Sequence, residues 1–73
     1  MKRIERKRGI DNSGNTILDL QISKTSDLPT LGGKLEINDT ITVGAGSCAE
    51  IIQTGKVATL DDDGKWYADG AEV

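Results

Sequence analysis

The sequence contains no histidine and no phenylalanine, and its only cysteine is Cys48. A single cysteine forms no disulfide within its own chain. Without histidine, the chain lacks the commonest transition-metal ligand and the usual base that activates a serine or cysteine nucleophile. We therefore expect no intramolecular disulfide, no bound metal or cofactor, and no enzymatic activity.

Long apolar segments are missing as well. No stretch approaches the ~18 apolar residues of a membrane-spanning helix, and the basic N-terminus lacks the apolar run of a signal peptide. These features predict a protein that makes no contact with membranes and is synthesised in a reducing cytoplasm.

Large apolar residues are few in this chain of 73 residues, which is enough for one domain at most. A chain of this size buries only about 60% of the surface that its unfolded form exposes. Small scaffolds usually need a disulfide, a metal or partner chains to stay folded. With the first two disfavoured, the sequence predicts a homo-oligomer or docking onto a larger assembly, and a self-sufficient monomer is the alternative.

The net charge of −3 conceals an uneven distribution. Residues 1–10 carry five basic side chains and one acidic, 5 − 1 = +4, whereas residues 11–73 carry four basic and eleven acidic, 4 − 11 = −7. This predicts a basic N-terminal arm, residues 1–10, ahead of a single small β domain, residues 11–73. The basic residues of the arm are Lys2, Arg3, Arg6, Lys7 and Arg8.

We expect this arm to contact an acidic protein surface, and a solvated, frayed terminus is the alternative. Nucleic acid is disfavoured as a partner, because no aromatic residue accompanies the basic ones. The acidic remainder of the chain would also repel phosphate groups.

Turn residues and alternating hydrophobic residues divide the first half of the chain. Residues 11–15, Asp-Asn-Ser-Gly-Asn, favour a tight loop. Residues 16–23 have leucine or isoleucine at alternate positions, which is typical of a half-buried strand, and residues 4–10 could pair with it as a hairpin. Residues 24–33 contain the only proline and a Gly-Gly pair, so we interpret them as a connector and a candidate hinge.

Residues 34–43 alternate again, with Leu35, Ile37, Ile41 and Val43 on one face. Asp39 falls on this apolar face, so either one strand bends at residues 38–39 or two very short strands meet there. The glycine-rich residues 44–47 are then predicted to form a turn.

Residues 49–67 contain three short β-prone runs separated by two turn signals, and we interpret them as an antiparallel meander. A two-residue hairpin loop at residues 54–55 would place Ile52 opposite Val57 on one face. The other face would also carry apolar side chains, so the meander needs cover on both sides. The second turn would align Trp66 with Thr59 and Tyr67 with Ala58.

Together these patterns predict an all-β fold, a small antiparallel meander or barrel-like sheet of about five short strands with an extended N-terminal arm. We expect that arm to be flexible or exchanged between subunits. Trp66 and Tyr67 are either the main core aromatics or a binding hot spot. The candidate interface residues are Trp66, Tyr67, Ile51, Ile52 and Val57.

Three local patterns suggest chemistry, and each has a simpler structural interpretation. Ser47 and Cys48 follow a Gly-Ala-Gly run, but a nucleophile needs a neighbouring base, and lysine would have to take that role. The run lacks the third glycine and the following helix of a dinucleotide-binding loop, so we predict a turn. Residues 61–64, Asp-Asp-Asp-Gly, lack the alternate spacing of an EF-hand, so we predict a solvated loop rather than a cation site.

The second half of the chain also contains an ordered set of short motifs: Gly-Ser-x-Ala, then Thr-Gly-x-Val, then Asp-Gly-x-Trp-Tyr. In this order the motifs resemble a short element of tailed-bacteriophage virion proteins, and Leu28-Pro29-Thr30 resembles the Leu-Pro-Thr that often precedes it. The chain departs from the element at Ala58, where an aromatic residue is usual, and in a longer segment between Thr30 and Gly46. The matching residues are Gly46, Ser47, Ala49, Thr54, Gly55, Val57, Leu60, Asp63, Gly64, Trp66 and Tyr67.

The resemblance implies a non-enzymatic structural subunit or accessory protein of a phage particle, such as a head decoration, fibre-base or head–tail component. It implies a location in the virion, use in several copies, and a larger virion protein as partner. Two alternatives come from the residues themselves. One is a small nucleic-acid-binding or regulatory module that uses the basic arm, and the other is a carbohydrate-binding module that uses Trp66 and Tyr67.

Overall fold

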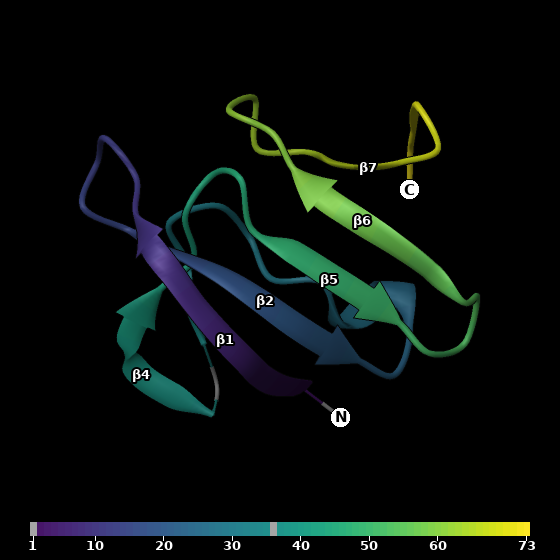
Figure 1. Cartoon of the computed structure of the whole chain (residues 1–73), viewed down its shortest axis with the longest axis horizontal. Coiled ribbons are helices and arrows are strands. Elements are labelled where there is room, and N and C mark those ends of the chain that lie inside the picture. The colour runs from purple at the N-terminus through teal and green to yellow at the C-terminus, as the bar shows by residue number, and fades with distance from the viewer. Residues whose placement is uncertain (1, 36) are drawn as a thin grey trace.

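The computed structural model is built of short β-strands and one 3-10 helix, η1 (Thr25–Asp27), so the predicted all-β class is confirmed (Figure 1). It describes residues 2–35 and 37–73, and at position 39 it describes the backbone alone. Within this part of the chain the strands are β1 (Lys2–Ile10), β2 (Thr16–Ile22), β3 (Lys34–Leu35), β4 (Asn38–Thr42), β5 (Cys48–Ile51), β6 (Lys56–Leu60), β7 (Trp66–Ala68) and β8 (Ala71–Glu72).

Six of these strands form one sheet in the order β1-β2-β5-β6-β7-β8, and β3 and β4 form a separate two-stranded sheet. The pairs in the large sheet are antiparallel except β2 and β5, which run parallel. The strands are therefore more numerous than the five or so expected, and the sheet is mixed. Parallel neighbours need a crossover connection, and residues 23–47 supply it.

The N-terminal segment is a strand of this sheet. β1 pairs with β2 from Lys2 opposite Ile22 to Ile10 opposite Thr16, which confirms the predicted hairpin. The expectation of a flexible arm is wrong for residues 2–10, because Ile4 packs on the core and the strand is hydrogen-bonded along β2. Met1 lies outside the described residues.

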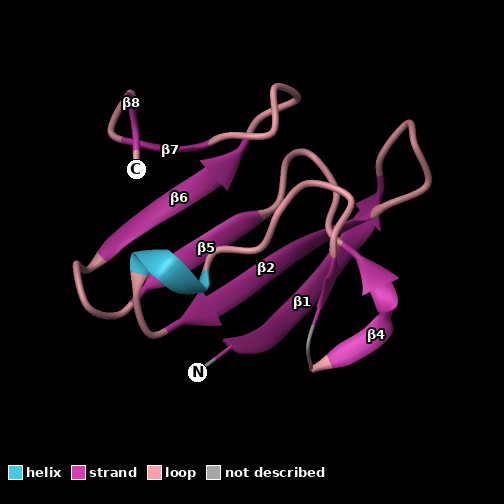
Figure 2. Ribbon diagram, turned by 180° about the vertical axis from the view of Figure 1, so that it is seen from behind, coloured by secondary structure: helices cyan, strands magenta, loops and turns pink. Residues whose placement is uncertain are grey.

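One face of the large sheet is covered by the crossover. Figure 2 shows η1 and the adjoining loops lying across the sheet on this side. The predicted alternation in β2 is confirmed, since Leu18, Leu20 and Ile22 are all buried beneath the crossover. The other buried hydrophobic residues are Leu35, Ile41, Val43, Ala49, Ile51, Ala58, Leu60, Trp66 and Ala68.

The first part of the crossover, residues 24–33, is the segment that the sequence suggested as a hinge. Pro29 is buried, and its carbonyl oxygen accepts a hydrogen bond from Nε1 of Trp66 at 2.7 Å. Backbone hydrogen bonds join Gly32 to Val43 at 2.8 Å and Val43 to Gly33 at 3.1 Å. The segment is thus packed on the core and leads from β2 of the large sheet to β3 of the two-stranded sheet.

Residues 34–43 form two very short strands, the second of the two alternatives that the sequence left open. β3 and β4 pair antiparallel, with Lys34 opposite Thr42 and Leu35 opposite Asn38. The chain therefore reverses direction between β3 and β4, and Ile37 is 49% exposed instead of facing the core. Glu36 and the side chain of Asp39 lie outside the described part of the chain.

The meander of β5, β6 and β7 forms as expected, but both of its turns differ in register. Ile51 pairs with Lys56, so the first loop has four residues, 52–55, and Ile52 lies in that loop instead of opposite Val57. The second turn has five residues between the paired strands, 61–65, one more than expected, and within it the N–H of Asp61 bonds to the carbonyl of Lys65 at 3.0 Å. In consequence Trp66 pairs with Leu60, not Thr59, and Tyr67 pairs with Thr59, not Ala58.

The hydrogen bond between Trp66 and Pro29 is expected to fix the crossover on the sheet. The substitution Trp66→Phe removes the donor and leaves the buried Pro29 carbonyl unpaired, which should lower the free energy of unfolding by about 1–3 kcal/mol. Urea denaturation followed by far-UV circular dichroism measures this, since the variant has no tryptophan. Val57→Ala, at a position 58% exposed, is the control and should change stability by less than about 0.5 kcal/mol. Equal stability of Trp66→Phe and the natural protein would contradict this role.

Candidate functional site

The face of the large sheet opposite the crossover carries polar side chains in rows that run across the strands. Side chains alternate along a strand, so the residues between the buried leucines of β2 point to this outer face. One row runs from Arg3 through Gln21 and Glu50 to Val57. The second row runs across five strands, and its members are Arg6, Asp19, Cys48, Thr59 and Tyr67.

The first row links the edge strand to the middle of the sheet. Nη2 of Arg3 donates to Oε1 of Gln21 at 2.6 Å, and Nε2 of Gln21 donates to Oε1 of Glu50 at 2.8 Å. Arg3 also lies 3.9 Å from the carboxylate of Glu5. Gln21 therefore bridges a cation on β1 and an anion on β5.

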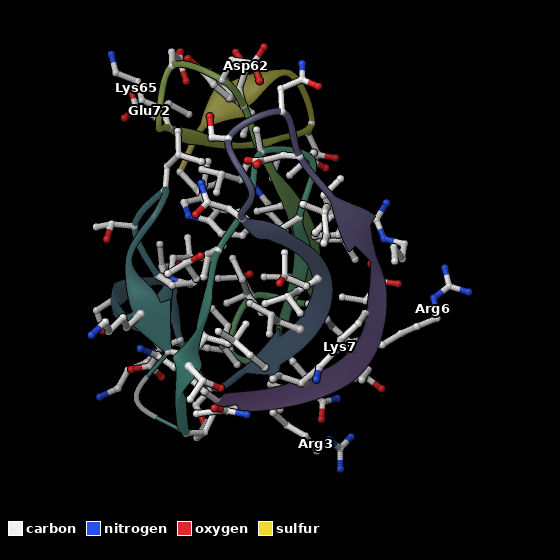
Figure 3. The ribbon with its side chains drawn as sticks, turned by 90° about the vertical axis from the view of Figure 1, so that its left-hand side faces the viewer. Arg3, Arg6, Lys7, Asp62, Lys65 and Glu72 are labelled. Carbon is white, nitrogen blue, oxygen red and sulfur yellow. The ribbon has the colours of Figure 1, made fainter. Side chains whose placement is uncertain are left out.

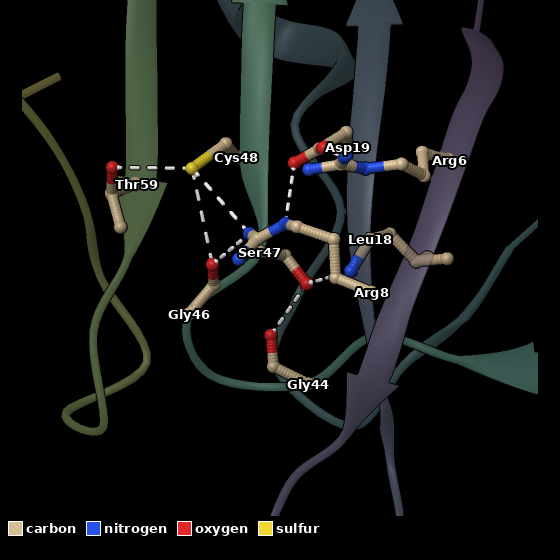
Figure 4. A network of polar contacts seen from close by, with 9 residues as sticks. All are labelled: Arg6, Arg8, Leu18, Asp19, Gly44, Gly46, Ser47, Cys48 and Thr59. Atoms are coloured by element: carbon tan, nitrogen blue, oxygen red, sulfur yellow. Dashed lines mark hydrogen bonds and ion pairs between the residues drawn. The ribbon is translucent and has the colours of Figure 1, made fainter.

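The second row contains the strongest ionic contacts on this face, which Figure 4 shows from close by. Asp19 receives two guanidinium groups: Nε of Arg6 lies 3.2 Å from Oδ2, and Nε of Arg8 lies 2.7 Å from Oδ1. Nη2 of Arg8 also donates to the carbonyl oxygen of Gly46 at 2.5 Å and lies 3.6 Å from Sγ of Cys48. Arg8 thus ties the edge strand to the turn before β5.

These contacts hold three of the basic residues of β1, Arg3, Arg6 and Arg8. Arg8 lies within a register shift between Lys7 and Gly9, and a second shift lies between Ile4 and Arg6. Such bulges bend an edge strand and interrupt its regular hydrogen bonding. In Figure 3, Arg3 and Arg6 point outward from the edge of the sheet, and Lys7 lies in front of the ribbon between β1 and β2. The predicted basic arm is therefore a basic edge on which Arg3, Arg6 and Arg8 have defined contacts.

Ser47 has a structural role that the sequence did not indicate. Its side chain is fully buried, and its hydroxyl oxygen accepts the N–H of Leu18 at 3.0 Å while donating to the carbonyl oxygen of Gly44 at 2.7 Å. This joins the turn before β5 to the middle of β2. The neighbouring Cys48 is half-buried on the outer face, 3.6 Å from the hydroxyl of Thr59.

The Gly-Ala-Gly run forms a turn, as predicted. The N–H of Gly46 bonds to the carbonyl of Leu60 at 2.8 Å, so the turn continues the pairing of β5 with β6. Gly44 packs closely against backbone, because a Cβ there would lie 3.0 Å from the carbonyl oxygen of Asn15. The glycines therefore serve the packing of the turn against the β1–β2 loop.

The β1–β2 loop is organised by Asp11. Its Oδ1 accepts the N–H groups of Ser13 at 2.9 Å and Asn15 at 2.8 Å, and its Oδ2 accepts the N–H of Ala45 at 3.2 Å. Desolvation acts to raise the pKa of this carboxyl, but these hydrogen bonds to its charged form lower the pKa below its ordinary value. An open groove of about 500 Å³ lies beside this loop, bordered also by Leu31 and Asp62.

The turn between β6 and β7 is a solvent-exposed hairpin loop, as predicted. Oδ2 of Asp63 accepts a hydrogen bond from the hydroxyl of Tyr67 at 2.6 Å, and its Oδ1 accepts the N–H of Lys65 at 2.8 Å. This bond to Asp63, with desolvation and nearby acidic charges, raises the pKa of Tyr67 to about 12. Within residues 2–35 and 37–73, no three His, Cys, Asp or Glu side chains are grouped to hold a metal ion.

The structure separates the candidate interface residues into two groups. Ile51 and Trp66 are 1% and 7% exposed and belong to the core of the single chain, so they are not available for contact with another subunit. Ile52 and Val57 are 52% and 58% exposed, and Tyr67 is half-buried on the outer face. Only the second group remains as a candidate contact surface.

The chain matches no protein-family model, no curated protein sequence and no solved structure. The one helix in the described residues is far too short to cross a membrane.

The bond between Tyr67 and Asp63 predicts how the only tyrosine titrates. Its raised pKa means that the protonated phenol stabilises the folded state below about pH 10, and this contribution is lost as the pH rises through about 12. Ultraviolet absorbance at 295 nm measures tyrosinate directly. Asp63→Ala removes the acceptor and should move the pKa down toward 10, while circular dichroism confirms that the protein is folded. An unchanged pKa in Asp63→Ala would show that the bond does not form.

Proposed function

We propose that the protein is a non-enzymatic structural or accessory subunit of a bacteriophage particle, and that it docks onto an acidic protein surface through β1. The observation that carries this proposal is the row of basic side chains on an ordered edge strand. Arg6 and Arg8 are held by Asp19 at 3.2 and 2.7 Å, so their directions are set before any partner binds. An ordered surface avoids the cost of ordering the backbone on binding.

The charges on this edge are exposed, which decides what kind of binding they support. The side chains of Arg3 and Arg6 are 60% and 69% exposed. Exposed charges at an interface contribute more to the rate and orientation of association than to affinity. Such a contact is effective when it is repeated, because linked copies raise the effective concentration of each contact. Multiple copies on one particle provide that arrangement.

The assignment to a phage particle comes from the resemblance of residues 46–67 to an element of tailed-phage virion proteins. In the structure these residues form the β5–β6–β7 meander. Gly55 and Gly64, two of the resembling positions, have φ of 72° and 84° and lie in its two turns. The motif thus coincides with one continuous supersecondary unit. A head decoration, a fibre-base component and a head–tail component all agree with this.

The two alternative functions receive less support from the geometry. A sugar-stacking site needs an exposed aromatic face, whereas Trp66 is 7% exposed and its indole N–H is bonded to Pro29. Nucleic-acid binding through β1 would lack base stacking, because residues 2–10 contain no aromatic side chain. A protein surface rich in carboxylates fits the edge better.

The test is the protein content of the particles produced by the genome that encodes this chain. Quantitative mass spectrometry of purified particles should find the protein in several copies each. A variant with Arg3→Glu and Lys7→Glu, which leaves the contacts of Asp19 intact, should be incorporated at least tenfold less. The matched control is Lys24→Glu with Lys34→Glu, which makes the same charge change at exposed positions outside β1 and should be incorporated normally.

Absence of the natural protein from purified particles would contradict the assignment to the virion. Normal incorporation of the Arg3→Glu, Lys7→Glu variant would show that β1 is not the docking surface. Circular dichroism of each purified variant establishes that it is folded before its incorporation is compared.

A further inference from the structure

The two ends of the large sheet carry opposite charge. Residues 2–10 carry five basic side chains and one acidic, 5 − 1 = +4. Residues 61–73, which contain the last turn, β7 and β8, carry Lys65 and five acidic side chains, 1 − 5 = −4. The strands β1 and β8 lie at opposite edges of the sheet, and Asp62, in the turn before β7, borders the groove beside the β1–β2 loop. Figure 3 shows Arg3, Arg6 and Lys7 far from Asp62 and Glu72.

Much of this charge is not neutralised within the chain. Among the described residues, Lys7, Asp61 and Asp62 form no ion pair within 4.0 Å. The pairs at the acidic edge are loose and exposed, with Lys65 3.9 Å from Glu72 and Lys56 3.8 Å from Asp69. Each edge therefore presents its charge to solvent and to any neighbouring molecule.

We propose that a second copy of this chain is a partner of the basic edge, and that copies associate head to tail, with β1 of one against residues 61–73 of the next. This rests on the docking role of β1 proposed above. Two copies that meet through the same edge would place +4 against +4 or −4 against −4, and like charges repel. A head-to-tail contact between the unlike edges pairs +4 with −4. Such a contact repeats, giving either a closed ring or an open row of subunits.

The contact is made by side chains and does not extend the sheet from one molecule to the next. β1 contains two register shifts, and β8 has only two residues. Bulges, charged side chains and short strands are features that hinder pairing between sheet edges. The association is therefore ionic and exposed, so a single contact is weak. It should also depend strongly on salt, because the screening length falls from about 30 Å at 10 mM to 3 Å at 1 M ionic strength.

Two variants remove the charge of one edge each. The edge variant, Arg3→Glu with Lys7→Glu, changes residues 2–10 from +4 to 4 − 4 = 0. The acidic-end variant, Asp61→Lys with Asp62→Lys, changes residues 61–73 from −4 to −4 + 4 = 0. Both leave the Asp19 contacts and the Tyr67–Asp63 bond in place. The control is Lys24→Glu with Lys34→Glu.

Sedimentation velocity of the purified proteins at about 10 mM ionic strength measures their association. The natural protein and the control should form species larger than one chain as concentration rises, and 1 M salt should dissociate them. Each edge variant alone should associate at least tenfold more weakly. An equimolar mixture of the two should form a dimer and nothing larger, because one variant retains the acidic edge and the other retains the basic edge.

Three outcomes would overturn the head-to-tail contact, and a fourth would refute the docking function instead. A natural protein that remains one chain at low salt shows that copies do not associate. Normal association of the acidic-end variant shows that residues 61–73 are not the partner surface, yet leaves docking of β1 onto another protein intact. Failure of the mixture to form a dimer likewise shows that the basic edge does not bind residues 61–73. Loss of association in the edge variant with normal incorporation into particles would instead refute the proposed docking function and leave the self-contact standing.

Discussion

The fold depends on the parallel pairing of β2 with β5. Two adjacent parallel strands cannot be joined by a tight turn, so the intervening chain must cross one face of the sheet. Here the crossing residues provide Leu35, Ile41 and Val43 to the core, and the bond from Trp66 to Pro29 holds them there. The chain thereby covers one sheet face with its own residues and leaves the other face to solvent.

The open face and the two sheet edges follow from this arrangement. Because the crossover occupies the inner side, the polar residues of β2 and β5 face outward, where Asp19 meets Arg6 and Arg8 of β1 and Glu50 accepts a hydrogen bond from Gln21. These contacts bind β1 to the sheet and set the direction of its charges. The same contacts distinguish an ordered basic edge from a loose charged tail.

The local features of the sequence predicted local structure well. Alternation in residues 16–22 identified β2 and its buried side, and glycines and aspartates marked the loops at 11–15 and 61–64. These local patterns do not predict which residues far apart in the sequence come into contact. Leu20 pairs with Ala49 across 29 positions, and nothing near either residue indicates a parallel partner. The burial of Ser47 is likewise set by Leu18 and Gly44 and has no local signal.

The sequence predicted which basic residues make up the candidate site but not how the fold arranges them. The basic residues near the N-terminus were evident, but a segment with one interior hydrophobic residue gives no period-two signal, so the sequence left open both a hairpin with residues 16–23 and a loose arm. Its place is decided by Asp19, which the sequence could not connect with Arg6 and Arg8. The sequence left Trp66 as either a core residue or a binding residue. Five residues, one more than expected, separate Leu60 from Trp66, and this register places Trp66 opposite the buried Leu60.

The most direct test of this account is the backbone mobility of β1 in solution. Nitrogen-15 relaxation gives an order parameter for each amide on the picosecond to nanosecond timescale. If the basic edge is fixed to the sheet, the amides of residues 3–9 should have values near 0.85, like those of β2. Values below about 0.6 along these residues would show a loose tail and would contradict the account.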